Sequence, residues 1–174
     1  MPFILVAPAN YPYILAGLAA NFFACQLHAP LVGLSARRAA MTQEHLAQFD
    51  AEHKAAFGES SKVDMLGQPD QGTGWYSKKL GYKEWVQFNS AQRIIMNYVE
   101  SFPYLIVSSL VAGFYFCEVA IACVFLTLLG RIAYAVGYKK SPQYRTAGGI
   151  IIQLSALLLM ALAFASSFFF LMSN

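Results

Sequence analysis

Long stretches of this sequence contain no charged residue, and this absence most constrains what the chain can fold into. Residues 1–36 and 146–174 hold no Lys, Arg, Asp or Glu. Each run is longer than the about 20 apolar residues that cross a bilayer core as a helix. The apolar block 94–138 is interrupted by only three charged residues. This block is too long for one membrane span and fits two.

We therefore expect an all-α integral membrane protein, a four-helix bundle forming a single transmembrane domain over residues 1–174. Only 12% of the residues are charged, about half of the roughly 25% found in soluble domains, which argues against a water-exposed globule. The predicted helices cover about residues 11–35, 92–113, 118–138 and 147–171.

The basic residues favour one topology. With four spans, segments 36–92 and 139–146 lie on the same side of the membrane, and all twelve Lys and Arg residues lie at or near that side. The positive-inside rule predicts such an asymmetry, so we place the extended loop 40–87 on the cytosolic or matrix side. Within it, residues 41–57 fit a short amphipathic helix, whereas the Gly and Pro content of residues 67–74 predicts a plain loop.

Polar side chains gather toward the loop-side ends of the predicted helices. Residues spaced i, i+3, i+4 or i+7 share one face of a helix. Three groups result: Arg93, Asn97 and Glu100 on the second helix; Arg131, Tyr134 and Tyr138 on the third; and Arg37, Arg38 and Arg145 at the loop-side ends of the first and fourth.

Two interpretations of these groups stay open. Glu100 could pair with Arg131 to tie two helices together, with the terminal arginines snorkelling to the interface. Alternatively, the arginines outnumber nearby acidic partners and form a pocket for an anion, because guanidinium binds carboxylates in a bidentate fork. Glu100 and Asn97 would then suit an ammonium or amide, so the ligand is a small zwitterion with an extra carboxylate. The three histidines are scattered, and we expect no metal site and no nucleic-acid partner.

The same residues resemble a known pattern. Segment 88–103 (FNSAQRIIMNYVESFP) is similar to the helix 2 signature of the MAPEG family, the membrane-associated proteins of eicosanoid and glutathione metabolism. Segment 130–138 (GRIAYAVGY), followed by Arg145, resembles the helix 3 signature, and segment 35–39 (SARRA) resembles the basic motif of helix 1. Within the family, the motifs look most like the branch of microsomal glutathione transferase type 3, with leukotriene-C synthase as a relative.

This resemblance implies a homotrimer that binds glutathione between neighbouring subunits near the cytosolic face. Carried over residue by residue, it implies a catalytic pair and a larger glutathione-binding set. The catalytic residues would be Arg145, next to the sulfur, and Arg38. The glutathione-binding residues would be Arg37, Arg93, Asn97, Glu100, Arg131, Tyr134 and Tyr138.

The implied function is that of a glutathione transferase or peroxidase of the endoplasmic reticulum or mitochondrial membrane. A nearby cation lowers the pKa of a thiol and raises its thiolate fraction, and the thiolate would attack a lipophilic electrophile or lipid hydroperoxide. Some positions depart from the family pattern: Ile95 and Met96 replace polar residues, Ser101 replaces a tyrosine found in some members, and loop 40–87 is longer. The alternative is therefore a structural subunit of a larger, mitochondrial membrane complex with little or no catalysis.

Overall fold

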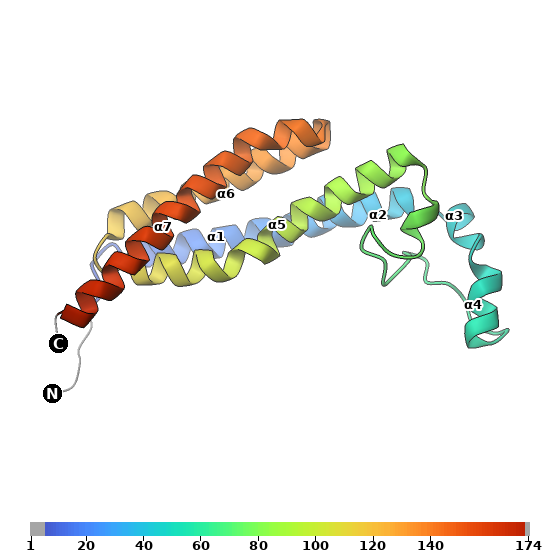
Figure 1. The fold of residues 1–174 in the computed structure, drawn as a ribbon, viewed down its shortest axis with the longest axis horizontal. Helices are drawn as coiled ribbons and strands as arrows, with labels where there is room; N and C mark the ends of the chain where they lie inside the picture. Colours follow the sequence, from blue (N-terminus) through green and yellow to red (C-terminus); the bar gives the residue numbers. More distant parts are fainter. Residues whose placement is uncertain (1–5, 173–174) are drawn as a thin grey trace. The chain divides into compact units, whose positions relative to one another are not determined.

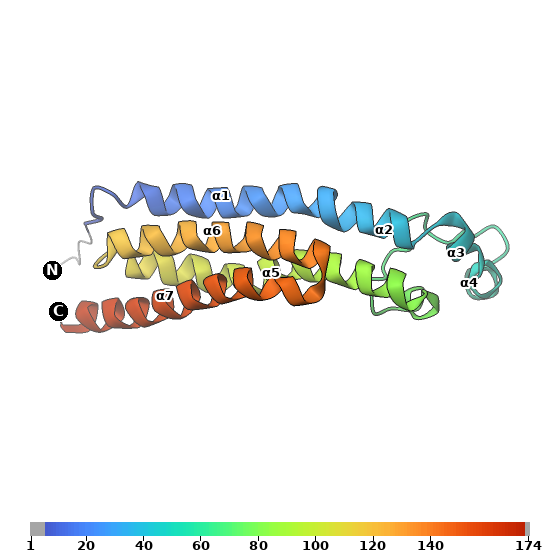
Figure 2. The same cartoon turned by 90° about the horizontal axis from the view of Figure 1, so that it is seen from above.

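The computed structural model describes residues 6–172, and this part of the chain is built from helices and connecting turns (Figures 1 and 2). In chain order the elements are α1 (Pro12–His28), the π-helical turn η1 (Ala29–Leu34), α2 (Ser35–Ala40), α3 (Gln43–Ala47), α4 (Asp50–Phe57), the 3₁₀ turn η2 (Ser77–Lys79), α5 (Tyr82–Ala112), α6 (Cys117–Lys140), the 3₁₀ turn η3 (Pro142–Arg145) and α7 (Thr146–Met172).

Four of the described helical stretches are long and apolar enough to cross a membrane: Pro12–Ala40, Tyr82–Ala112, Cys117–Lys140 and Pro142–Met172. The predicted all-α class and the four membrane helices are thereby confirmed. The first two stretches reach further into the connecting segment than the sequence predicted. Helical hydrogen bonding does not require apolar side chains, so α5 starts ten residues before its predicted start, in polar sequence.

A proline marks the change of helix type inside the first span. Pro30 lacks a backbone N–H, and its ring crowds the carbonyl of the preceding turn. Rare π-helical stretches occur as single turns inside α-helices. Here residues Ala29–Leu34 adopt that wider form, and the helix continues as α2 to Ala40.

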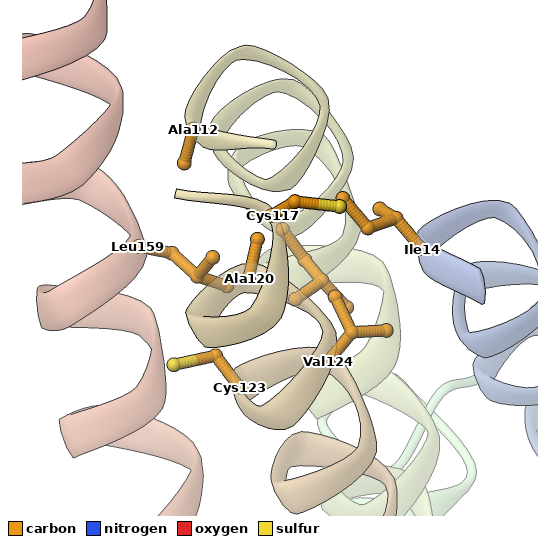
Figure 3. Packing of buried hydrophobic residues seen from close by; sticks show 8 residues of the cluster. Ile14, Ala112, Cys117, Ala120, Cys123, Val124 and Leu159 are labelled. Carbon is orange, nitrogen blue, oxygen red and sulfur yellow. The ribbon is translucent and has the colours of Figure 1, made fainter. Parts of the chain in front are cut away.

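The chain divides into two compact units, which we describe one at a time. The first contains residues 6–26 and 97–172, and the second contains residues 27–96. In the first unit all four membrane helices contribute to one apolar core (Figure 3). Its buried members are Ile14 from α1, Leu105 and Ala112 from α5, Cys117, Ala120, Cys123 and Val124 from α6, and Leu159 from α7.

Helices α6 and α7 lie side by side in both views (Figures 1 and 2), and glycines permit this close approach. A Cβ atom at Gly148 of α7 would overlap the backbone nitrogen of Tyr134 and the carbonyl oxygen of Gly130 on α6. A Cβ atom at Gly137 would overlap the carbonyl oxygen of Tyr144 in η3. Small residues let membrane helices pack backbone against backbone in this way. The turn η3 is therefore held directly against α6.

The second unit gives the predicted loop a defined fold. The expected helix over residues 41–57 is present as two short helices, α3 and α4, interrupted at Gln48 and Phe49. The hydroxyl of Thr42 accepts a hydrogen bond from the backbone nitrogen of His45 at 3.2 Å, and such a bond caps a helix start. Leu46 is buried with Met41 in a small core beneath α5, whereas Phe57 is exposed.

The stretch that the sequence predicted as a plain loop is fastened by one carboxylate. Asp70 Oδ1 accepts hydrogen bonds from the backbone nitrogens of Gly72 at 2.8 Å and Gly74 at 2.9 Å, and from the Ser77 hydroxyl at 2.7 Å. Its Oδ2 accepts from the Ser77 backbone nitrogen at 2.6 Å. Burial alone would raise the pKa of Asp70, but these hydrogen bonds to the charged form outweigh it and hold the pKa below its ordinary value. Residues 70–77 therefore form a tight, ordered turn.

Candidate functional site

In the first unit, Arg131 of α6 is the most deeply buried charged side chain of the predicted set, with 1% of its surface exposed. Its Nη2 donates a hydrogen bond to the Ser101 hydroxyl at 2.6 Å. Its guanidinium carbon lies 4.3 Å from the ring centre of Tyr98 and 4.6 Å from that of Phe102. Aromatic faces attract cations, so two rings of α5 stabilise this charge inside the bundle.

The partners of Arg131 share one face of α5 because Tyr98, Ser101 and Phe102 are spaced i, i+3 and i+4. The Ser101 hydroxyl donates to the carbonyl oxygen of Asn97, which leaves its lone pairs free to accept from Arg131. In the sequence, Ser101 stood out only because it replaces a tyrosine found in some family members. In the structure its hydroxyl links α5 to α6.

Several polar atoms at this place have no hydrogen-bond partner within the described part of the chain. They are Nε and Nη1 of Arg131 and Oδ1 of Asn97, all buried. Glu100 is exposed on α5. The hydrogen bond from Arg131 to α5 is accepted by Ser101, a neutral side chain. Buried donors and acceptors of this kind normally find a partner, so the patch retains capacity for further polar groups.

Tyr134, Tyr138 and Arg145 form a second group, at the end of α6. The rings of Tyr134 and Tyr138 meet edge to face, with centres 5.1 Å apart and planes at 70°. The guanidinium carbon of Arg145 lies 5.2 Å from the centre of the Tyr138 ring, and its Nη1 donates to the carbonyl oxygen of Pro142 at 2.8 Å. Because η3 packs against α6 at Gly137, the exposed cation is held beside the tyrosine pair.

The second unit holds the other three predicted residues: Arg37, Arg38 and Arg93. Arg37 is buried and donates from Nη1 to the carbonyl oxygen of Leu66 at 3.1 Å and from Nη2 to Gln71 Oε1 at 3.2 Å. Its guanidinium also lies over the ring of Phe88. Arg37 therefore fastens the segment 66–71 to α2, and its acceptors are neutral. Arg38 and Arg93 are exposed.

The structure thus brings part of the predicted set together. Arg131 with Asn97 and Ser101 forms one contact group, and the tyrosine pair with Arg145 forms another, both in the first unit. Sequence reasoning missed Tyr98 and Phe102, although their spacing from Ser101 was a usable signal. No group of three or more His, Cys, Asp or Glu residues able to hold a metal occurs among residues 6–172.

Comparisons with known proteins agree with this architecture. The model of the MAPEG family matches residues 15–165, which is most of the chain and includes every part of the site described above. No curated protein matches the chain. Since the family match extends over all four apolar helices, the chain belongs to the MAPEG family of integral membrane proteins, whose function is related to glutathione.

Proposed function

We propose that this protein is a glutathione-dependent membrane transferase or peroxidase acting on lipophilic electrophiles or lipid hydroperoxides. The observation that carries the proposal is the exposed guanidinium of Arg145, positioned by η3 over Tyr138 at the end of α6. Bound glutathione would supply a thiol that, once deprotonated, attacks such electrophiles. The task of the chain is then to bind the tripeptide, orient it and favour the thiolate.

The donor set fits this ligand. Glutathione carries two carboxylates, an ammonium and a thiol, which call for cationic donors together with carboxylate and amide acceptors. Arg145 and Arg38 are exposed cations, Glu100 is an exposed carboxylate, and Asn97 Oδ1 is a buried acceptor with no partner among the described residues. We assign Arg93, Asn97, Glu100, Tyr134 and Tyr138 to the tripeptide.

Arg131 and Arg37 contribute differently, because both are buried. Arg131 positions the Asn97 turn of α5 through Ser101, and we assign it a supporting place in the glutathione site. Arg37 uses two N–H groups to hold residues 66–71, and its other N–H groups are assigned to a ligand carboxylate. Arg145 is the group assigned to thiolate formation, since a neighbouring cation lowers the pKa of a thiol.

The family resemblance supports two further parts of the proposal. The active form is a homotrimer, with glutathione bound between neighbouring subunits. The membrane is that of the endoplasmic reticulum or the mitochondrion. Large apolar side chains exposed along α1, α6 and α7, such as Phe23, Leu129 and Leu154, are available to lipid and to neighbouring subunits alike.

Substitution of Arg145 tests the role of its charge. In detergent-solubilised protein, Arg145→Ala should leave glutathione binding within a few-fold of the unmodified chain but remove the thiolate absorbance that appears on binding. Arg145→Lys, which keeps the positive charge, should retain part of this thiolate absorbance. Lys140→Ala is the matched control, because Lys140 is also exposed near this turn but lies outside the assigned set. Arg93→Ala should instead weaken binding itself. Equal and small effects of Arg145→Ala and Arg93→Ala would contradict the site.

A structural subunit of a larger membrane complex is the second candidate. The engagement of Arg37 and Arg131 by their own chain favours it, since these charges are stabilised without a ligand. This candidate predicts no glutathione conjugation, no reduction of an organic hydroperoxide, and migration on a native gel with other membrane proteins. The enzyme predicts turnover by the purified chain.

A further inference from the structure

The second unit contains a cavity that the glutathione site does not use. It has a volume of about 690 Å³ and lies between α4 and the turn 69–76. Small-molecule sites usually have volumes of about 300–1,000 Å³ and mainly apolar walls. This cavity falls in the segment 41–80, outside the four candidate membrane spans, and therefore needs an explanation of its own.

Four aromatic side chains are among the twelve residues that line the cavity. Phe49, Phe57, Trp75 and Tyr76 line it together with His53. Phe57 is 73% exposed and Trp75 is 63% exposed, although rings of this size gain considerable free energy from burial. An occupant between these two rings would cover apolar surface that water now contacts.

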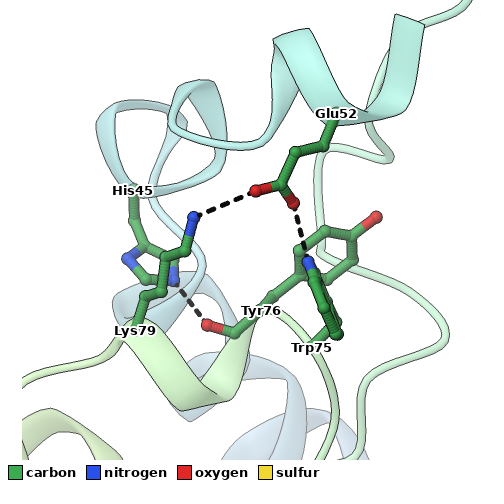
Figure 4. A network of polar contacts seen from close by, with 5 residues as sticks. All are labelled: His45, Glu52, Trp75, Tyr76 and Lys79. Atoms are coloured by element: carbon green, nitrogen blue, oxygen red, sulfur yellow. Dashed lines mark hydrogen bonds and ion pairs between the residues drawn. The ribbon is translucent and has the colours of Figure 1, made fainter. Parts of the chain in front are cut away.

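Polar contacts made by residues of the wall hold it in place (Figure 4). Trp75 Nε1 donates to Glu52 Oε2 at 2.8 Å, which ties the turn to α4. His45 Nε2 lies 3.0 Å from the carbonyl oxygen of Tyr76, and the Tyr76 ring meets Phe49 edge to face at 4.9 Å. A cavity formed before binding loses little conformational entropy when a ligand enters.

The acidic groups of the wall are already engaged by contacts within the protein. Glu52 Oε1 pairs with Lys79 Nζ at 3.5 Å, and hydrogen bonding by Trp75 together with that charge holds the pKa of Glu52 below its ordinary value. Asp70 directs both oxygens into its own turn. The amide oxygen of Gln71 accepts from Arg37. An ionic ligand would compete with these contacts for a charged partner, whereas an uncharged ligand leaves them intact.

From the cavity volume, its exposed aromatic side chains and the internal contacts of its acidic groups, we infer that this cavity binds an uncharged, lipophilic small molecule with a planar or aromatic body. None of the residues that line this cavity belongs to the glutathione site assigned above. The inference therefore does not depend on the proposed catalysis. Binding to the cavity is measured without glutathione, so the two proposals fail independently.

Trp75 provides the readout. The chain has two tryptophans, so Trp85→Phe leaves Trp75 as the only indole. The probe is the benzoate ester of 4-hydroxy-TEMPO, an uncharged lipophile whose nitroxide quenches indole fluorescence. It is titrated into the full-length variant in detergent, and cyclohexyl benzoate, which lacks the nitroxide, is the competitor. We expect quenching that saturates and that excess competitor reverses.

Neighbouring alanines of α4 give a matched pair of variants in the Trp85→Phe background. Ala56 lines the cavity and Ala55 does not, while both are exposed. Ala56→Phe should fill the cavity and weaken probe binding at least tenfold, whereas Ala55→Phe should leave it within twofold. If Ala56→Phe does not fold, as judged by size-exclusion chromatography, Phe57→Ala should also weaken binding, because it removes an exposed part of the wall.

Three results would overturn the inference. Quenching that grows without saturation and ignores the competitor would mean that Trp75 lies in the detergent or bilayer interface. Absence of quenching would mean that the probe does not bind beside Trp75. Equal affinities of the Ala55→Phe and Ala56→Phe variants would mean that the probe binds elsewhere.

Discussion

Removal of the Asp70 carboxylate should open the turn that forms one side of the aromatic cavity. Asp70 is 5% exposed and accepts three backbone hydrogen bonds and one from a hydroxyl, within residues 72–77. In Asp70→Ala these donors lose their acceptor while the Ser77 side chain remains buried. Buried donors without an acceptor are costly, so the turn should open to regain hydrogen bonds with water.

The size of the effect follows from the bonds. A hydrogen bond to a charged group contributes about 1.5–3 kcal/mol, and bonds to one carboxylate are not additive, so we expect a total of about 3–4 kcal/mol. Each 1.4 kcal/mol corresponds to about a factor of ten. Amide hydrogen exchange at Gly72, Gly74 and Ser77 should therefore accelerate about 10²- to 10³-fold, measured by mass spectrometry on the intact protein in detergent.

Two variants serve as controls. Asp70→Asn keeps one oxygen but presents an amide group to the Ser77 nitrogen, so its acceleration should be intermediate. Asp64→Ala removes an exposed carboxylate that accepts from the backbone nitrogens of Leu66 and Gln68, and residues 72–77 should exchange as in the unmodified chain. Unchanged exchange of residues 72–77 in Asp70→Ala would refute the reasoning.

Acid should act on the same turn. The folded-state pKa of Asp70 lies below its ordinary value, because hydrogen bonds to the carboxylate outweigh the effect of burial. The carboxylate therefore contributes its full stabilisation above the unfolded pKa of about 3.9, and the contribution is lost as the pH falls through the lower folded pKa. Protection of residues 72–77, corrected for intrinsic exchange, should fall over that range in the unmodified chain. A pH-independent protection would contradict this assignment.

Other substitutions test the packing of the first unit. Gly148→Ala forces a Cβ atom against the backbone of α6 and should lower the free energy of unfolding in mixed micelles by about 1–3 kcal/mol; Gly149→Ala, whose Cβ would meet only ring atoms at 3.8 Å, should be tolerated. Ser101→Ala removes the hydrogen-bond acceptor of Arg131 and should cost about 1–3 kcal/mol in the same assay; Ser109→Ala, whose hydroxyl bonds within its own helix, should cost less. Equal losses within either pair would contradict these assignments.

The distribution of charge predicted the membrane helices because the bilayer penalises charged side chains wherever they face lipid. It did not predict where those helices end. Residues 82–91 include Lys83 and Glu84, so they are not part of an apolar run, yet they belong to α5. Phe88 anchors this part of the helix in the small core with Met41 and Leu46. Likewise, Pro30 indicates a disruption of the first helix but not the form it takes, here a π-helical stretch.

The sequence indicated which polar side chains share a helix face, but only some of the contacts between them. The i, i+3 and i+7 spacing put Arg131, Tyr134 and Tyr138 on one helix face, and the structure shows the tyrosine rings touching. The choice of Ser101 as the partner of Arg131 depends on how α5 and α6 pack. The Asp70 turn was equally difficult to predict, because three of its four donors are backbone groups, which carry no sequence signature.

Glutathione binding by the purified chain tests the central proposal most directly. Radiolabelled glutathione is added to the protein in detergent, and the bound fraction is measured at equilibrium with and without an excess of S-hexylglutathione. The proposal predicts saturable binding that the S-alkylated competitor displaces and that Arg93→Ala weakens. Binding that never exceeds the detergent blank, or that is identical in the Arg93→Ala variant, would contradict it.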